Sequence, residues 1–133
     1  MKLSILDQSV AIANKCQDQV INDTLNLSIM AEELGYSRFW ISEHHNHPTI
    51  IGTAPEILMA AIAAKTNKIR IGSAGIMLPH YSPFKVAEQF RVLNSLAPNR
   101  IDLGLGRAPG SDGRTALALN SNNREFSENF PSH

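Results

Sequence analysis

Short apolar runs alternate with longer amphipathic stretches along the chain. Four of the runs have the length and the branched or aromatic residues that favour β-strands, and they lie at residues 3–6, 38–42, 69–76 and 100–105. Between them, apolar positions recur every three or four residues and predict helices at about 18–34, 53–66 and 82–97, with a fourth beginning near Arg114. Strands that alternate with helices form βα units around a parallel sheet. The pattern therefore predicts an α/β fold of the order βαβαβαβ(α).

The loops that follow the predicted strands are longer and chemically richer than the loops that precede them. Residues 44–52, 78–82 and 106–113 all follow strands, whereas the turns at 35–37 and 98–99 are short. In parallel α/β folds, ligands bind at the carboxyl ends of the strands. We therefore expect the functional site among these three loops.

Composition narrows the class of protein. The 133 residues carry 12 Lys+Arg against 12 Asp+Glu, and 43% are hydrophobic, which argues against disorder and against a nucleic-acid binder. A single cysteine, Cys16, excludes an intrachain disulfide framework. No apolar run approaches the roughly 20 residues of a membrane span, and Asp7 interrupts any signal-peptide core. We expect one domain over residues 1–133, cytoplasmic, with neither nucleic acid nor membrane as a partner.

Three histidines cluster just after the second predicted strand. Neighbouring residues of a strand point to opposite faces, so His44 and His45 cannot both enter one pocket if the strand continues through them. One histidine would then serve proton transfer near neutral pH while the other orients it. A polar loop with histidines by chance is the plainer interpretation. A metal site of His44, His45 and His47 is a third, although no second ligand cluster supports it.

The third predicted strand ends in a run of small residues, GSAG at 72–75. Small side chains at a strand end admit a flat ligand against the backbone, whose N–H and C=O groups can bind it. Tight packing of strand against helix explains the same run equally well. His80 and Tyr81 follow at the rim of the same loop.

The segment GLGRAPG at 104–110 is not a dinucleotide-binding loop. Pro109 stands where that fingerprint needs its third glycine, and Arg124 stands where it needs an acid. The segment also follows the fourth strand rather than the first.

The same segment presents Arg107, whose planar guanidinium suits a phosphate. Ser111 and Arg114, near the expected start of a helix, could assist through hydroxyl, charge and backbone N–H groups. A surface salt bridge is the alternative role of Arg107. Glu88 lies in the first turns of the third predicted helix, where a solvent-exposed face is the usual place for a glutamate.

Four segments occur in an order that strongly resembles the bacterial luciferase-like, flavin-dependent monooxygenase family. They are WISEHHN at 40–46, GSAGIMLP at 72–79, VAEQ at 86–89 and RIDLGLGR at 100–107. The resemblance implies a TIM barrel that binds FMN or the deazaflavin F420. It also implies dimerisation through the second and third helices.

The resemblance assigns roles to residues by motif. His44 is similar to the family's active-site histidine, with His45 its neighbour, and Arg107 to an arginine on the flavin phosphate. The run at 73–75 is similar to the segment that lies against the isoalloxazine, where the family often has a non-prolyl cis peptide. The expected catalytic residues are His44 and His45, and the expected cofactor-binding residues are Ser73, Ala74, Gly75, Glu88 and Arg107.

Two departures from the family pattern shape the expected function. Gly106 stands where true luciferases carry a cysteine, which argues against light emission. An eight-stranded barrel needs about 250 residues, so we expect the N-terminal half of a barrel, about four strands, that dimerises or aggregates through its open edges. The sequence leaves open whether this half is active alone.

The expected reaction uses reduced FMN and O2 on an aldehyde-like or other small organic substrate. F420-dependent hydride transfer, a non-catalytic flavin-binding protein and a histidine-metal hydrolase are the alternatives.

Overall fold

A parallel four-stranded sheet forms the centre of the protein. The computed structural model describes residues 1–121, and the strand order is β1-β2-β3-β5. All three pairings are parallel, and Phe39 of β2 lies opposite Ile5 on one side and Ile71 on the other. This confirms the predicted α/β class. The strands are β1 (Ser4–Asp7), β2 (Arg38–Ile41), β3 (Arg70–Ser73) and β5 (Ile101–Asp102).

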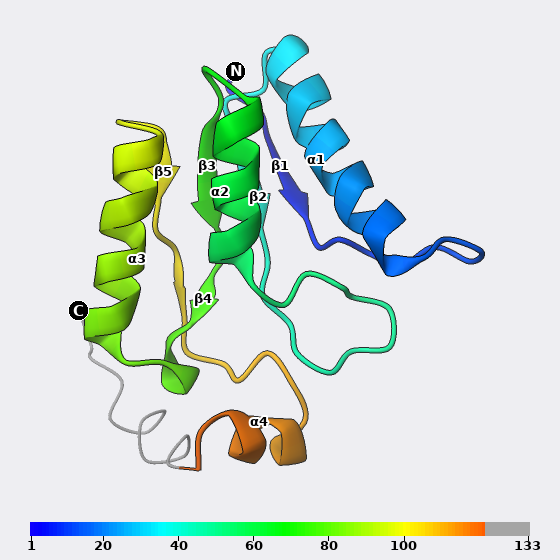
Figure 1. Ribbon diagram of the computed structural model, residues 1–133, viewed down its shortest axis with the longest axis vertical. Coiled ribbons are helices and arrows are strands. Elements are labelled where there is room, and N and C mark those ends of the chain that lie inside the picture. Colours follow the sequence, from blue (N-terminus) through cyan, green and yellow to red (C-terminus); the bar gives the residue numbers. More distant parts are fainter. Residues whose placement is uncertain (122–133) are drawn as a thin grey trace.

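Three helices pack against one face of this sheet (Figure 1). They are α1 (Gln17–Glu33), α2 (Pro55–Lys65) and α3 (Pro83–Leu96), each joining one strand to the next. The polar loops and a short fourth helix, α4 (Gly113–Leu119), lie at the end of the sheet toward which the strands point. None of the helices among residues 1–121 is long and apolar enough to cross a membrane.

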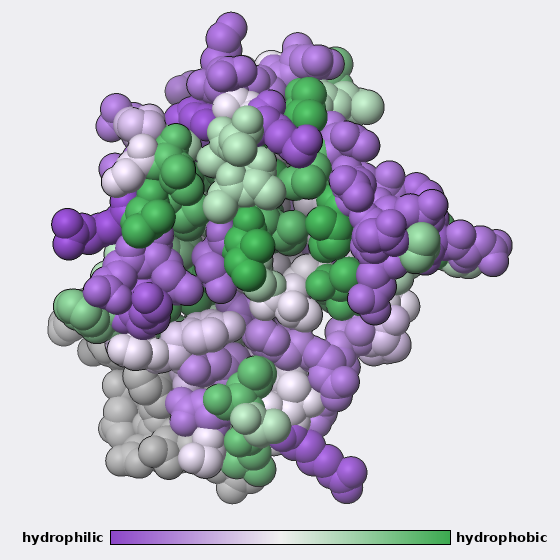
Figure 2. Space-filling view, viewed as in Figure 1, coloured by the Kyte–Doolittle hydropathy of each residue, from purple (hydrophilic) through white to green (hydrophobic). Residues whose placement is uncertain are grey.

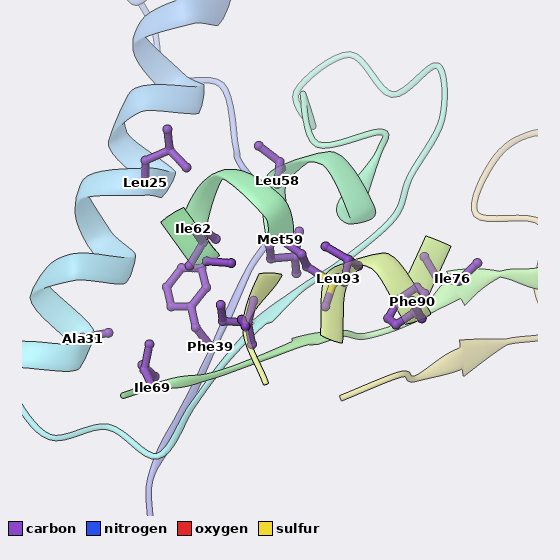
Figure 3. Packing of buried hydrophobic residues seen from close by; sticks show 14 of the residues in the cluster. Leu25, Ala31, Phe39, Leu58, Met59, Ile62, Ile69, Ile76, Phe90 and Leu93 are labelled. Atoms are coloured by element: carbon purple, nitrogen blue, oxygen red, sulfur yellow. The ribbon is translucent and has the colours of Figure 1, made fainter. Parts of the chain in front are cut away.

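The core lies between the sheet and the helices because the strands alternate in polarity. Phe39, Ile41 and Ile71 are fully buried and belong to the same hydrophobic cluster as Met59 and Ile62 of α2. Figure 3 shows Phe39 beneath α2 in this cluster. Burying each such side chain contributes about 1.5–3 kcal/mol. The intervening strand positions project to the opposite face, where the Trp40 ring lies over Gly72.

The third and fourth predicted strands are each interrupted, which corrects the continuous strands expected at 69–76 and 100–105. Beyond β3 and β5, the chain forms a separate two-stranded parallel sheet of β4 (Ile76–Met77) and β6 (Leu105–Gly106). A side-chain contact between the two strands explains the interruption. The Ser73 hydroxyl donates to the Gly104 carbonyl at 2.9 Å and accepts from the Gly104 N–H at 3.0 Å, which replaces the strand ladder there.

The helix boundaries agree with the periodicity to within two residues. Gly35 has φ +79°, as a left-handed residue after a helix requires. The residues TAPE at 53–56 are typical of a capped helix start, but α2 begins at Pro55 with Ala54 before it, and the Thr53 side chain does not cap it.

Candidate active site at the carboxyl ends of the strands

The loops that follow β2, β3 and β6 are joined to one another at the end of the sheet. The Ala74 N–H donates to the Ile41 carbonyl at 2.7 Å, which ties the end of β3 to β2. The His45 N–H donates to the Gly110 carbonyl at 2.9 Å, which ties the loop after β2 to the loop after β6. These bonds bring the predicted segments together at the edge where the loop lengths placed the site.

A fully buried carboxylate, Glu43, lies at the centre of these loops. Its Oε1 accepts a hydrogen bond from the Tyr81 hydroxyl at 2.6 Å and another from His45 Nε2 at 2.7 Å. Its Oε2 accepts from the Met77 N–H at 2.9 Å. Burial, together with the hydrogen bond to Glu43 and its negative charge, raises the pKa of Tyr81 far above its ordinary value. Tyr81 is therefore a permanent donor to this carboxylate.

His80 extends this arrangement to the loop after β6. Its Nε2 donates to the Pro109 carbonyl at 2.6 Å, since a carbonyl can only accept. The His45 and His80 rings meet edge to face, with centroids 5.5 Å apart and planes at 88°. His45 is thus held by a carboxylate and by a second ring.

His44 has a different environment from His45. Its backbone N–H donates to the Gly52 carbonyl at 3.4 Å, but its Nδ1 atom is buried and bonds to none of residues 1–121. Ser42 lies two residues earlier and is 3% exposed, and its hydroxyl is likewise without a partner in the described part of the chain. Buried polar atoms are normally hydrogen-bonded, so each of these two atoms can still form a hydrogen bond with a ligand or a water molecule.

The small residues after β3 pack closely against the backbone of the neighbouring loop. The Ala74–Gly75 peptide is cis, as the resemblance implied. A Cβ on Gly75 would lie 2.8 Å from the Gly104 carbonyl oxygen, and Ser73 is fully buried. Ala74, by contrast, is exposed. The run therefore packs strand against strand rather than strand against helix, and it leaves the face of Ala74 open.

Arg107 follows β6 directly, and its side chain is exposed. It forms no ion pair with any of the described residues, so the structure does not show the surface salt bridge considered as its alternative role. A cation without a partner beside the strand ends is free to meet an anion.

The helix that follows does not assist Arg107 as expected. The Asp112 carboxylate accepts from the N–H groups of Arg114 (2.9 Å) and Thr115 (3.1 Å) at the start of α4. Hydrogen bonds from the Thr115 hydroxyl and from these N–H groups lower the pKa of Asp112 to about 2. The N–H groups expected to help hold a phosphate are therefore occupied by a negatively charged cap.

Glu88 is not brought together with these residues. It lies on an exposed part of α3, 3.5 Å from Lys85 Nζ, and lines a groove between α2 and α3. The three histidines of the possible metal site also have separate surroundings. His47 Nδ1 accepts from the Thr49 N–H at 3.3 Å, while His45 bonds Glu43. Residues 1–121 contain no group of three or more His, Cys, Asp or Glu placed to hold a metal ion.

Two residues of the site carried no predicted role. Glu43 has the same strand parity as Phe39 and Ile41, so alternation alone could have indicated a buried carboxylate. Ser42 had no such signal, because a serine at a strand end is as often exposed as buried.

Comparison with known proteins agrees with the fold and with the motifs at this edge. A family described as luciferase-like monooxygenase matches residues 1–127. The N-acetyl-S-alkylcysteine monooxygenase of Bacillus subtilis (strain 168) is 54% identical over 83% of this chain and 33% of its own length. A luciferase-like monooxygenase of Escherichia coli (strain K12) is 44% identical over 96% of this chain and 38% of its own.

A solved structure shows the same relationship in three dimensions. The crystal structure of apo-MsnO8 has 45% identity and a TM-score of 0.86, covering 89% of this chain and 36% of that one. The chain thus spans between a third and two-fifths of the length of these relatives. Its parallel βα units are those of the family's TIM barrel. Sequence and fold together show that the chain belongs to the luciferase-like monooxygenase family.

Proposed function

We propose that the carboxyl ends of β2, β3 and β6 form part of an FMN site in a flavin-dependent monooxygenase that oxidises a small organic substrate. One observation carries the proposal. Two buried polar atoms without partners, Ser42 Oγ and His44 Nδ1, occur at the same edge as the open face of Ala74 and the unpaired Arg107. Such an edge offers hydrogen bonds, a flat surface and a positive charge to one ligand.

The residues fit the parts of FMN. Ala74 has a single methyl group and is exposed, so a planar ring system can approach the backbone at this point. Arg107 has a free guanidinium, which binds phosphate by two parallel hydrogen bonds. Riboflavin has the same rings but no phosphate, so it separates the two contributions.

Reduced FMN, when bound, supplies the electrons that activate dioxygen. The chain's own part is binding and proton handling. His44 Nδ1 is shielded from solvent and has no partner among residues 1–121, so the imidazole can hold or deliver a proton at that atom. Glu43 and His45 flank His44 in sequence and are both fixed by hydrogen bonds, which limits the positions that His44 can take.

The substrate that we propose is a small organic molecule, with an aldehyde as one possibility. The relative at 54% identity is named for N-acetyl-S-alkylcysteines, which are thioethers, so the class extends beyond aldehydes. F420-dependent hydride transfer remains the second candidate, and turnover with each reduced cofactor in turn separates the two. We also retain the cytoplasm as the expected compartment.

A homodimer through α2 and α3 belongs to the same proposal. Figure 2 shows hydrophobic residues gathered over these two helices. Val92 and Leu96 are each 61% exposed and Ile57 is 66% exposed, although all three are large and apolar. The groove between the helices is lined by Ile57, Ala60, Val92, Leu93 and Leu96, together with Glu56, Lys85, Glu88 and Gln89.

Binding of FMN and riboflavin tests the proposal. Arg107→Ala should weaken FMN binding about tenfold or more, since a charge-assisted contact contributes about 1.5–3 kcal/mol, and should leave riboflavin binding unchanged. Arg91→Ala, on the exposed face of α3, is the matched control. His44→Ala should weaken FMN and riboflavin binding to the same extent, because both flavins lose the same hydrogen bond, and should lose turnover. Equal FMN affinity in wild type and Arg107→Ala would overturn the phosphate assignment, and a wild type that binds neither flavin would overturn the function.

A further inference from the structure

Glu43 is the only fully buried carboxylate among residues 1–121, and it neither binds the ligand nor transfers a proton in the proposed reaction. We propose that Glu43 is a positioning residue whose carboxylate clamps the loops after β2, β3 and β6, so that His44 and Arg107 face the same ligand. The proposal rests on the flavin site proposed above.

The three donors to Glu43 come from separate parts of the chain. His45 belongs to the loop after β2, Met77 to β4, and Tyr81 to the turn before α3. A single carboxylate therefore joins the end of β2 to both ends of the segment that follows β3.

The loop after β6 is attached to the same cluster through backbone groups. The Gly110 carbonyl accepts from the His45 N–H, and the Pro109 carbonyl accepts from His80 Nε2. Gly110 has φ +61°, and a Cβ there would lie 3.0 Å from the Glu43 carbonyl oxygen, so only glycine lets this loop pass so close. Arg107 lies between this attachment and Gly106, which pairs with Met77.

A carboxylate is the group that these three donors require. An ionised carboxylate only accepts hydrogen bonds, and burying it is costly unless donors surround it. An amide of the same shape has one accepting and one donating end. Glu43→Gln must therefore turn an N–H2 group toward a donor, so that either Met77 loses its acceptor or His45 and Tyr81 must become acceptors.

Loss of the Glu43 hydrogen bonds would affect both His44 and Arg107. His44 lies between Glu43 and His45, so releasing His45 widens the range of positions of His44. Arg107 is held on one side by β6 and on the other by Pro109 and Gly110, so releasing the second attachment frees its loop. Within residues 1–121, the strand residue that donates a hydrogen bond to the Glu43 carboxylate is Met77 of β4.

If Glu43 only stabilised the fold, replacing it would lower the free energy of unfolding and leave the ratio of FMN to riboflavin affinity unchanged. Glu43→Gln and Tyr81→Phe provide two separate disruptions, and Glu33→Gln, an exposed carboxylate on α1, is the matched control. We expect Glu43→Gln to lower FMN affinity about tenfold more than riboflavin affinity, because the phosphate contact depends on Arg107. Tyr81→Phe should produce a smaller change in the same direction.

A second readout needs no flavin. In Glu43→Gln, nuclear magnetic resonance should show faster amide exchange at Met77 if the new N–H2 group faces that residue, or a move of the His45 ring proton from Nε2 to Nδ1 if it faces His45. In both cases amide exchange at His45 should rise, while that at Ile71 of β3 should stay unchanged. An unchanged affinity ratio, or an unchanged ring proton and unchanged exchange, would overturn the clamp. If the wild type binds neither flavin, the proposed function fails, while the predicted ring and exchange changes would still support the clamp of the loops.

Discussion

The contact between Gly104 and Ser73 should be intolerant of a single methyl group. A Cβ at residue 104 would lie 2.2 Å from the Ser73 carbonyl oxygen, whereas ordinary contact begins at 3.4 Å. The obstacle is backbone rather than a flexible side chain, so Gly104→Ala must move the two segments apart by about 1 Å. That movement also stretches both hydrogen bonds between the Ser73 hydroxyl and Gly104.

The expected cost follows from these two effects. Overpacking of this kind costs about 1–3 kcal/mol, and each weakened hydrogen bond about 1 kcal/mol. We therefore expect Gly104→Ala to lose about 3–5 kcal/mol of unfolding free energy, a large part of the roughly 5–15 kcal/mol of an ordinary domain. Flavin affinity should fall too, because Ala74 moves with Ser73.

Urea denaturation followed by circular dichroism measures the effect, and Gly113→Ala is the matched control. Gly113 begins α4 outside the left-handed region, and a Cβ there meets nothing within 4 Å. Alanine at that position should stabilise by about 0.5–1 kcal/mol. A Gly104→Ala variant as stable as the wild type would show that β3 and the segment after β5 do not approach as closely as described.

Three further predictions concern pH and association. In the folded chain, Glu43 and Glu56 help to raise the pKa of Tyr81. The contribution of Tyr81 to the free energy of unfolding is therefore fully present below about pH 10. It is lost as the pH rises further, because the unfolded chain then releases the phenol proton while the folded chain retains it. Urea midpoints at neutral and alkaline pH should show this slope in the wild type and a weaker one in Tyr81→Phe; identical slopes would contradict it. The Asp112 carboxylate has a pKa of about 2 and stabilises α4 at any pH above the ordinary aspartate pKa. This stabilisation is lost as the pH falls toward 2, which should change the Cα chemical shifts of residues 113–119. Asp112→Asn should remove that acid-dependent change. Val92→Glu should abolish a dimer seen by sedimentation while Leu117→Glu on α4 leaves it intact, and a monomeric wild type would refute that interface.

The order of elements and the edge that carries the site could be predicted from the sequence. Periodicity separated strands from helices, and loop length indicated the carboxyl ends of the strands. Phe39, Ile41 and Ile71 illustrate why: fully buried positions on one strand face leave a clear alternation in the sequence.

The interruptions of the third and fourth strands could not be predicted in the same way. They depend on a contact between Ser73 and Gly104, which are 31 residues apart, and no local pattern contains that pairing. The tight approach of Gly75 to Gly104 is likewise a property of the pair. The runs of small residues indicated close packing without saying what packs against them.

The sequence predicted that His44 and His45 have different surroundings, but not which of the two is held by other residues. Alternation showed that His44 and His45 must differ, but which one is fixed depends on the Glu43 carboxylate, which binds His45 together with Tyr81 and Met77. Glu88 illustrates the limit of motif transfer. Its motif matches the family, while its side chain lies beside Lys85 on α3, so its proposed place near the flavin rests on the resemblance alone.

Chemical-shift mapping with FMN tests the central claim most directly. In a titration of the isotope-labelled chain, we predict that amide shifts concentrate at residues 42–45, 73–77 and 105–110, and that riboflavin reproduces the first two groups but not the shifts around Arg107. Shifts confined to the groove between α2 and α3, or spread evenly over the chain, would contradict a flavin site at the carboxyl ends of the strands.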